Sequence, residues 1–236
     1  MPTIKYKQRF NKDFFETQNW QENQLVCGID EVGRGCLAGP VVTAAVILFP
    51  NKKSRLLKDS KLLDQEEREK GFAWIRKNAW FSYGIINHRD IDTYNIYHAT
   101  LRAMKRTLMQ LFAHCPNLPQ KILVDAMPVN LEKTAYSNLE VIYFPFGERK
   151  SSSIAAASIV AKNIRDEIMR KLDPVFPHYK FARHKGYSTK VHQQAIREHG
   201  HSIIHRLRFL DNKYWLSDEQ ATLPFEKNDE HTLKIE

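Results

Sequence analysis

The stretch LVCGIDEVGRGCLAGPVVTAAVILFP, residues 25–50, joins two apolar runs through a turn that contains three glycines. The first run, 25–29, and the longer run, 41–49, are rich in the β-branched residues that strands favour. Since only a short loop separates them, the sequence predicts an antiparallel strand pair. Two adjacent acids, Asp30 and Glu31, stand where the first strand meets the turn.

The pattern on either side of this pair alternates between strands and helices. An Asp64-x-x-Glu67 sequence is typical of a capping box at the start of a helix, and Gly200 is typical of a helix end. Hydrophobic spacing predicts further strands at 80–86, 121–124 and 139–144, and helices at 64–78, 94–112, 151–172 and 189–199. Mixed strands with helices between them predict an α/β layer fold with a mixed sheet.

Composition limits the class of protein. The chain has 236 residues, of which 42% are hydrophobic, and this suits one domain with a real core. No apolar run approaches a membrane span, no signal-peptide core is present, and the three scattered cysteines match neither a disulfide framework nor a zinc site, so we expect a cytoplasmic protein. The net charge is +9, and because residues 217–236 carry −4, the remainder carries +13. A basic body indicates a polyanionic partner.

Acids follow three of the predicted strands. Besides Asp30 and Glu31, Asp125 follows the strand at 121–124, and Glu148 comes just after VIYFPFG. Strand ends are where α/β sheets build sites, and converging carboxylates stay ionised most readily by binding hard cations such as Mg²⁺ or Mn²⁺. A solvated strand-end acid remains the alternative for each residue taken alone. Adjacent strand residues point to opposite faces, so Asp30 and Glu31 share a site only if the backbone is distorted or a main-chain carbonyl also ligates.

The turn Gly33-Arg34-Gly35 exposes backbone N–H groups and allows close approach of a ligand. Such a turn suits a phosphate or a sugar, although an ordinary hairpin with a solvated arginine remains the alternative.

Further motifs stand in a fixed order along the chain. They are GIDEVGRG with LAGPVV (28–42), KDSKLLDQEERE (58–69), IDTYNIYHATLRAM (91–104), LVDAM (123–127), AAASIVAKNIRDEIM (155–169), HKGYSTKVH (184–192) and HRLRF (205–209). Together they resemble the motifs of bacterial ribonuclease HII, and the resemblance covers roughly residues 28–209.

The resemblance implies a ribonuclease-H-like fold, with a mixed five-stranded sheet flanked by helices and a C-terminal helical portion. It implies endonucleolytic cleavage of the RNA strand of RNA–DNA hybrids, and cleavage beside ribonucleotides embedded in duplex DNA, with 3′-hydroxyl and 5′-phosphate products. Asp30, Glu31 and Asp125 match three catalytic carboxylates that hold Mg²⁺ or Mn²⁺, and a two-metal mechanism is expected.

The resemblance also implies substrate contacts. Gly33, Arg34 and Gly35 match a loop that contacts the ribonucleotide 2′-hydroxyl, the group that distinguishes RNA from DNA. Tyr187 matches a tyrosine that stacks on the sugar at the RNA–DNA junction. Five basic residues are candidate phosphate contacts, with a merely solvated base as the alternative for each: Lys61, Lys162, Arg165, His184 and Lys185.

Glu148 departs from the family pattern, which usually has aspartate as the fourth acid. Ribonuclease HIII uses glutamate in that role, but it carries a lysine in its glycine motif and an extra N-terminal domain. Three hypotheses follow: a ribonuclease HII with Glu148 as the fourth catalytic and metal-binding acid, a hybrid-only nuclease of HIII-like specificity, and a catalytically inactive nucleic-acid-binding relative. Retention of the other three acids argues against the last.

The sequence divides into an N-terminal extension (1–24), a catalytic domain (25–215) and an acidic tail (216–236) that is expected to be flexible. Gln220, Leu223 and Phe225 in that tail fit the Q-x-x-L-x-F pattern of bacterial sliding-clamp ligands. A tail segment that docks on its own domain is the alternative. We expect a monomer with no membrane contact.

Overall fold

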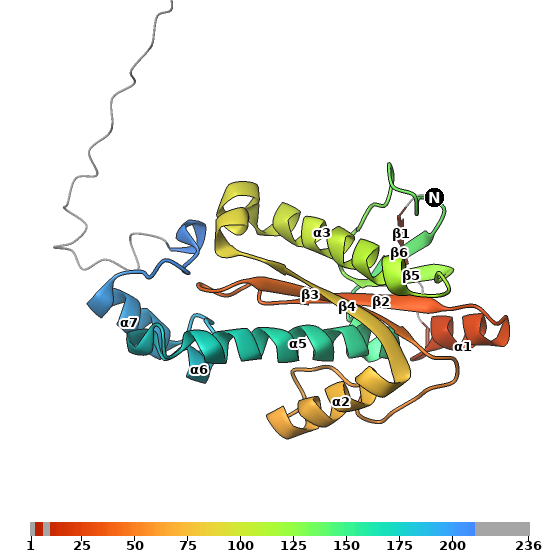
Figure 1. Ribbon diagram of the computed structural model, residues 1–236, viewed down its shortest axis with the longest axis horizontal. Coiled ribbons are helices and arrows are strands. Elements are labelled where there is room, and N and C mark those ends of the chain that lie inside the picture. Colours follow the sequence, from red (N-terminus) through yellow and green to blue (C-terminus); the bar gives the residue numbers. More distant parts are fainter. Residues whose placement is uncertain (1–2, 7–9, 211–236) are drawn as a thin grey trace, which may run out of the picture.

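The computed structural model describes residues 3–6 and 10–210, which fold around one mixed β-sheet with helices on both faces (Figure 1). The strands are β1 (Ile4–Lys5), β2 (Val26–Val32), β3 (Val41–Leu48), β4 (Ala79–Ile86), β5 (Lys121–Asp125) and β6 (Glu140–Phe144). Their order in the sheet is β1-β6-β5-β2-β3-β4. The predicted pair β2–β3 is antiparallel, as is β3–β4, and the other neighbours are parallel. The expected five-stranded sheet therefore gains a sixth, two-residue strand, β1.

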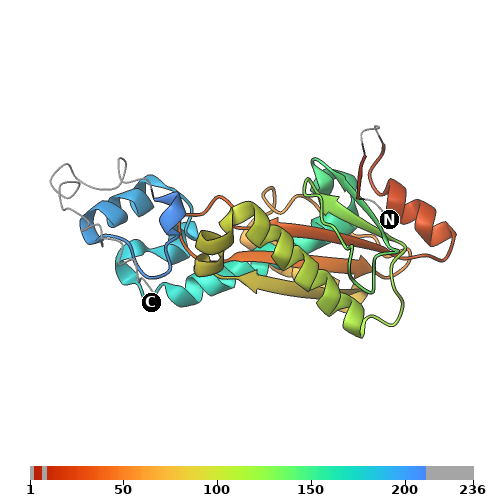
Figure 2. The same cartoon turned by 90° about the horizontal axis from the view of Figure 1, so that it is seen from above.

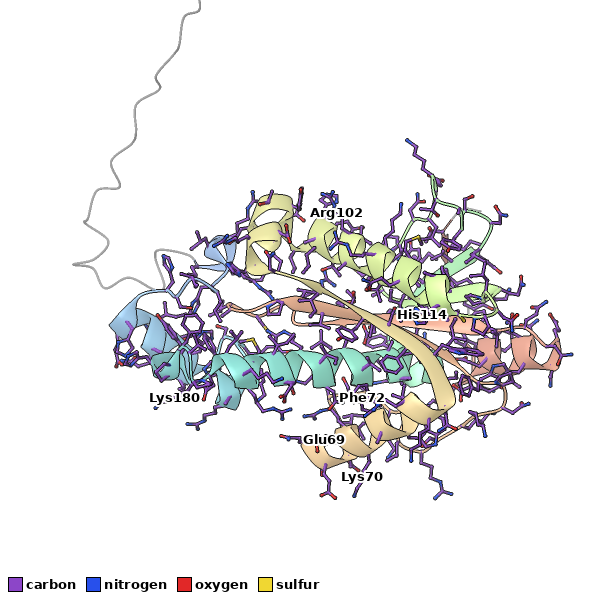
Figure 3. The ribbon with its side chains drawn as sticks, viewed as in Figure 1. Glu69, Lys70, Phe72, Arg102, His114 and Lys180 are labelled. Carbon is purple, nitrogen blue, oxygen red and sulfur yellow. The ribbon has the colours of Figure 1, made fainter. Side chains whose placement is uncertain are left out.

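Helices cover the sheet on two sides. They are α1 (Phe14–Gln21), α2 (Gln65–Asn78), α3 (His88–His114), α4 (Gly147–Lys150), α5 (Ser152–Leu172), α6 (Phe181–His184) and α7 (Lys190–His199), with 3₁₀ turns η1 (Pro177–Tyr179) and η2 (Leu207–Phe209). Figure 3 shows Phe72 on α2 and Arg102 on α3 on opposite sides of the sheet. Figure 2 shows α6 and α7 gathered at one end of the molecule, which confirms a C-terminal helical portion.

Several helix ends follow directly from local sequence. Asp64 and Glu67 form the predicted capping box at the start of α2, and Thr189 caps α7 through its side chain. Helix α3 differs from the prediction, since it begins at His88 rather than at residue 94. Asn95 interrupts it with φ 62° and ψ 164°, and its side chain accepts a hydrogen bond from the backbone N–H of His98. The predicted helix is thus the second of two segments, which the local cap at Asn95 starts afresh.

Strand β2 extends further than predicted. Its pairing with β3 runs without a break from Cys27 to Val32, so Asp30 and Glu31 lie inside the strand rather than beyond its end. The hydrophobic pattern misses this extension because two charged residues interrupt the apolar run.

Helix α5 lies very close to β2. A Cβ atom on Gly28 would come within 2.2 Å of the Ser153 carbonyl carbon, so only glycine permits this approach. The alanines Ala155, Ala156 and Ala157 are fully buried at the same contact. The first turns of α5 are therefore held against the strand that carries the paired acids.

The N-terminal residues pack onto the same core. Phe15 and Trp20 of α1 are buried. Asp13 and Glu16 accept hydrogen bonds from the first backbone N–H groups of α5, at 2.7 Å for Ser152 and 3.1 Å for Ser153. The segment that the sequence assigns to an extension thus caps the helix on which the site is built.

Two further expectations concern membrane contact and the acidic tail. No helix in the described part of the chain has both the length and the apolar character to cross a bilayer. The predicted acidic tail, with Gln220, Leu223 and Phe225, lies outside the described residues.

Candidate active site

The four predicted acids line a single pocket of about 220 Å³ at the carboxyl ends of β2, β5 and β6. These three strands are parallel neighbours, so their ends meet at one edge of the sheet. Ile29 of β2 pairs with Val124 of β5, and the next residues along, Asp30 and Asp125, therefore lie side by side. Glu148 comes from the single turn of α4 that follows β6.

Asp30 and Glu31 reach the same pocket without a break in the β2–β3 ladder. Asp30 pairs with Ala44 and Glu31 with Thr43 in regular register, so backbone distortion, one of the two alternatives expected from strand geometry, is absent from this pairing. The Asp30 carboxylate accepts a hydrogen bond of 2.8 Å from the Glu31 backbone N–H. The Glu31 side chain is held by Arg34 at 3.2 Å, and its second oxygen, Oε2, is buried without a hydrogen-bond partner among the described residues.

Burial and mutual repulsion raise the proton affinity of the carboxylates. Burial, followed by the charges of Glu31, Asp125 and Glu148, raises the pKa of Asp30 well above its usual range. Burial raises the pKa of Glu31 to about 7, although Arg34 opposes the shift. Burial also raises the pKa of Asp125 and of Glu148, against opposing hydrogen bonds from Gly147 and Ser158 respectively. A site that holds protons this tightly favours any added positive charge.

The donor set fits hard divalent cations, which prefer carboxylate oxygen. The unpartnered Glu31 Oε2 is an oxygen that a cation would satisfy. Glu148, by contrast, is engaged by the Ser158 hydroxyl at 2.7 Å and by the Lys61 ammonium at 3.6 Å. Within residues 3–6 and 10–210, no three acidic, histidine or cysteine side chains stand close enough to enclose an ion as they are placed. Ligation of one ion by three or more of these acids therefore requires some of their side chains to move from the positions described.

Two buried arginines, Arg165 and Arg206, fix the main chain of the glycine turn by hydrogen bonds. Arg165 donates to the carbonyls of Pro40 (2.9 Å), Lys185 (2.8 Å) and Ala38 (3.2 Å). Arg206 donates to the carbonyls of Gly39 and Arg34. Neither side chain is exposed. Each of the three guanidinium nitrogens of Arg165 donates to a main-chain carbonyl and the side chain is fully buried, so the structure gives no support to the predicted phosphate contact.

Tyr187 lies beside the glycine turn and lines the pocket. It pairs with Cys36 in an isolated β-bridge, and its ring centre is 5.8 Å from the Lys162 Nζ and 5.6 Å from the Arg165 Cζ. The ring is partly exposed at 38%, as a surface for stacking requires. Cys36 itself is buried.

The other predicted substrate contacts divide into two groups. Gly33, Arg34, Lys61 and Lys162 line the pocket, whereas Gly35, His184 and Lys185 do not. His184 is buried and bonds the Tyr179 carbonyl at 2.7 Å, so it is not free to meet a phosphate. The Lys185 ammonium donates to the Ala182 carbonyl.

Two serines complete the pocket and were missed from the sequence. Ser158 donates to Glu148, and its hydroxyl lies 2.7 Å from that of Ser60. Ser158 is the polar residue that ends the run of buried alanines, and this interruption is the signal that points to it. Outside the pocket lining, Asp166 pairs with Lys162 at 2.6 Å and with Arg68 at 3.6 Å, so its carboxylate is engaged in ion pairs within α5 and with α2.

Comparison with known proteins gives close relatives over most of the chain. Residues 27–212 match the family model described as Ribonuclease HII. The chain is 45% identical over 207 residues to the ribonuclease HII of Lactobacillus acidophilus, covering 86% of this chain and 78% of that one. It is 44% identical over 200 residues to the ribonuclease HII of Pseudothermotoga lettingae, covering 85% and 82%.

Solved structures give the same result for the fold. Ribonuclease HII from Archaeoglobus fulgidus, in a complex with PCNA, superposes with a TM-score of 0.64 at 26% identity, over 78% of this chain and 93% of that one. Ribonuclease H2 from Pyrococcus horikoshii superposes with a TM-score of 0.61 at 25% identity, over the same shares. Since the matched residues include every residue of the acidic pocket, the chain belongs to the ribonuclease HII family of metal-dependent ribonucleases H.

Proposed function

We propose that this protein cleaves the RNA strand of RNA–DNA hybrids, cuts beside ribonucleotides embedded in duplex DNA, and leaves 3′-hydroxyl and 5′-phosphate ends. The observation that carries the proposal is that four carboxylates, the Gly33–Arg34 turn and Tyr187 surround one pocket. The carboxylates suit phosphodiester hydrolysis, whereas the glycine turn and the Tyr187 ring suit recognition of the sugar.

The proposed metal ligands are Asp30, Glu31, Asp125 and Glu148, and the proposed ions are Mg²⁺ or Mn²⁺, bound as a pair. Such ions supply an activated water and stabilise the charge of the leaving oxygen. The protein's own part is to place the carboxylates: Gly147 orients Asp125 at 2.8 Å, and Ser158 orients Glu148. Arg34 holds the Glu31 carboxylate in the pocket through an ion pair.

Substrate recognition is proposed to use backbone and ring rather than charge alone. The Gly33 region presents main-chain groups that fit closely around a 2′-hydroxyl, where larger side chains collide. The Tyr187 ring packs on the deoxyribose that follows the ribonucleotide and disfavours a further 2′-hydroxyl there. Lys61 and Lys162, which line the pocket, are the proposed phosphate contacts.

One assay tests this function. A duplex with a single embedded ribonucleotide and a continuous RNA–DNA hybrid are each incubated with the purified protein, with Mg²⁺, with Mn²⁺ and without metal. We expect metal-dependent cleavage of both, beside the ribonucleotide in the first substrate, with product ends assigned by ligation and phosphatase treatment. Absence of cleavage on both substrates under either metal would overturn the proposal.

Glu148 favours a second candidate, a nuclease of HIII-like specificity. That enzyme would cut the hybrid and leave the embedded ribonucleotide intact in the same assay. A Tyr187→Ala variant separates the two further, since loss confined to the embedded ribonucleotide assigns Tyr187 to the junction. Equal loss on both substrates would mean that Tyr187 only packs.

A contact with the sliding clamp is also proposed. The Gln220, Leu223 and Phe225 pattern supports it, as does the structural likeness to a ribonuclease HII that was solved with PCNA. Full-length protein should bind an immobilised bacterial clamp, and a Gln220→Ala/Phe225→Ala variant should not. Equal binding by both proteins would remove this motif from consideration. We further propose a cytoplasmic monomer whose catalytic domain spans 25–215, with an N-terminal segment (1–24) that packs on that domain and a C-terminal tail (216–236).

A further inference from the structure

Three buried histidines lie beneath the loop that carries Tyr187. His184, His192 and His205 are 7%, 0% and 1% exposed. His184 and His192 stack with ring centres 4.4 Å apart, and the Nε2 atoms of His192 and His205 are 3.0 Å apart. None of the three lines the acidic pocket, so the cluster takes no direct part in the chemistry of that pocket.

The hydrogen bonds fix the position of every ring proton. The Tyr187 carbonyl, at 2.9 Å from His192 Nδ1, is only an acceptor, so that nitrogen carries the proton and Nε2 of His192 accepts. His205 must then donate from Nε2, which leaves its Nδ1 to accept from the Ser202 backbone N–H at 2.9 Å. The chain is therefore directional: it runs from Ser202 through His205 and His192 to the carbonyl of Tyr187.

His184 completes the support from the other side. Its Nε2 donates to the Tyr179 carbonyl at 2.7 Å, and its Nδ1 accepts from the Gly186 backbone N–H at 3.2 Å. All six ring nitrogens in the cluster thus have protein partners, and none is left to bind a metal. Two of these bonds end on the backbone of residues 186 and 187, which places the cluster under the stacking tyrosine.

We propose that His192 and His205 are positioning residues that fix the main chain at Tyr187, and that they thereby set the preference for a single ribonucleotide over a continuous hybrid. The proposal rests on the proposed role of Tyr187 in the function above. Rotation of the 187 peptide would tilt the ring away from the glycine turn, to which it is bridged through Cys36. A stacking contact tolerates little tilt, whereas cleavage of a long hybrid depends less on one sugar.

The surroundings of His192 and His205 keep both imidazole rings in their neutral form. Burial lowers the pKa of His192 to about 4 and that of His205 to about 3. A second proton on either ring would set two N–H donors against each other at the Nε2–Nε2 contact. The side chains that pack on these two histidines include the aromatic rings of Tyr179 and Phe181. These rings carry no negative charge that would stabilise a protonated imidazole.

Two isosteric variants of His192 test the chain. In His192→Asn the amide lies where Nδ1 lies and retains a donor to the Tyr187 carbonyl. In His192→Gln the amide lies where Nε2 lies and loses that donor. We expect His192→Gln to lower kcat/KM on the embedded ribonucleotide about fivefold relative to the hybrid, the worth of one hydrogen bond, and His192→Asn to stay within about twofold of wild type. His114→Gln, on the far end of α3 from the C-terminal helices, is the matched control (Figure 3).

A double-mutant cycle separates positioning from general packing. In a Tyr187→Ala background, His192→Gln should leave the ratio of the two substrates unchanged, because the ring it positions is gone. Equal losses from Asn and Gln on both substrates, or an undiminished effect in the Tyr187→Ala background, would overturn the proposal.

A measurement on the unmodified protein covers the case in which the variants fail to fold. Long-range ¹H–¹⁵N spectra of the ring nitrogens should show His192 as the Nδ1–H tautomer and His184 and His205 as the Nε2–H tautomers. A His192 Nε2–H tautomer would contradict the proposed direction of the hydrogen-bond chain, whatever the activity of the protein. A wild-type protein that cuts neither substrate would overturn the proposed function and, with it, the role of the histidines in specificity. In that case the expected tautomers would still establish the hydrogen-bond chain from Ser202 to Tyr187.

Discussion

Asp30 is the most buried of the four acids, at 3% exposed, and it stands beside three other carboxylates. A group in this position is stable as an anion only when positive charge is near, and two cationic side chains of the same pocket, Arg34 and Lys61, are engaged with Glu31 and Glu148. Cation binding and proton binding therefore compete for the same oxygens.

Asp30→Asn and Asp125→Asn should each abolish cleavage while preserving binding to a hybrid. An amide keeps the shape of the side chain but loses the charge that holds a metal ion, and removing negative charge does not weaken attraction for phosphate. Single-turnover cleavage and fluorescence anisotropy measure the two properties separately. Retained turnover by either variant under both metals would remove that residue from the catalytic set.

Glu31 should make the metal-free protein less stable as pH rises. Its pKa is about 7 in the folded protein against an ordinary 4.5, so between these values the folded state keeps a proton that the unfolded chain has lost. Stability from this group is thus present below the lower value and is lost by pH 7. We expect Glu31→Gln to raise Tm in EDTA by about 5 °C at pH 8 and to change it little at pH 5. An equal change at both pH values would contradict the linkage.

Glu148 should be fitted to the site as glutamate. Since Ser158 and Lys61 hold its carboxylate, both Glu148→Asp and Glu148→Gln should lose Mg²⁺-dependent cleavage. Mn²⁺ should partly rescue only the aspartate variant, because larger ions tolerate displaced ligands better. A Glu148→Gln enzyme with wild-type rates would show that this acid binds no metal.

Among the elements, the glycine turn shows where sequence reasoning stops. The turn and the acids were predicted from residue types at strand ends, and the capping box at Asp64 and Glu67 predicted the start of α2, because those signals are local. Burial of Arg165 beneath Gly33 was not predictable in the same way. It depends on contacts between residues 125 or more positions apart, such as Arg165 with Pro40, and a basic residue on a helix has the same local pattern whether it is solvated or buried.

Gly33→Ala should destabilise the turn, and Gly35→Ala should not. Gly33 has φ 101°, and a Cβ atom there would lie 2.1 Å from the Arg165 Nε, whereas a Cβ on Gly35 meets nothing within 4 Å. We expect Gly33→Ala to lower Tm by about 5 °C or more through strain and displacement of the arginine. Thermal denaturation of the two variants side by side is the test, and equal Tm values would contradict it.

The whole molecule is tied together by its first residues. Helix α1 lies outside the part of the chain that matches the family model, yet Asp13 and Glu16 cap α5, which carries Ser158 and Lys162. The sequence analysis assigned residues 1–24 to an extension outside the domain. Hydrophobic spacing could not correct this, because it does not show which helix an acidic side chain caps. The sixth strand was missed for the same reason, since two residues of β1 have no pattern of their own.

Glu16→Ala should lower the stability of the whole domain, while Glu16→Gln should be nearly neutral. Glu16 is fully buried, accepts from Ser151 and Ser153, and has a pKa that burial raises, so a neutral amide is a close substitute. Loss of the cap and of the buried side chain should lower Tm by about 5–10 °C in the alanine variant. Similar Tm values for the alanine and glutamine variants would show that the cap contributes nothing.

The attachment of the N-terminus to β6 and α5 also determines when the fold can be completed during synthesis. Glu16 and its partner Ser151 are 135 residues apart, and β1 has no neighbour until β6 has been made. At ordinary rates of translation the ribosome needs roughly 7 to 27 s to add that length of chain. The first strand and helix therefore leave the ribosome long before their partners, and the closing of this sheet edge comes after the β2–β3–β4 meander has had time to form.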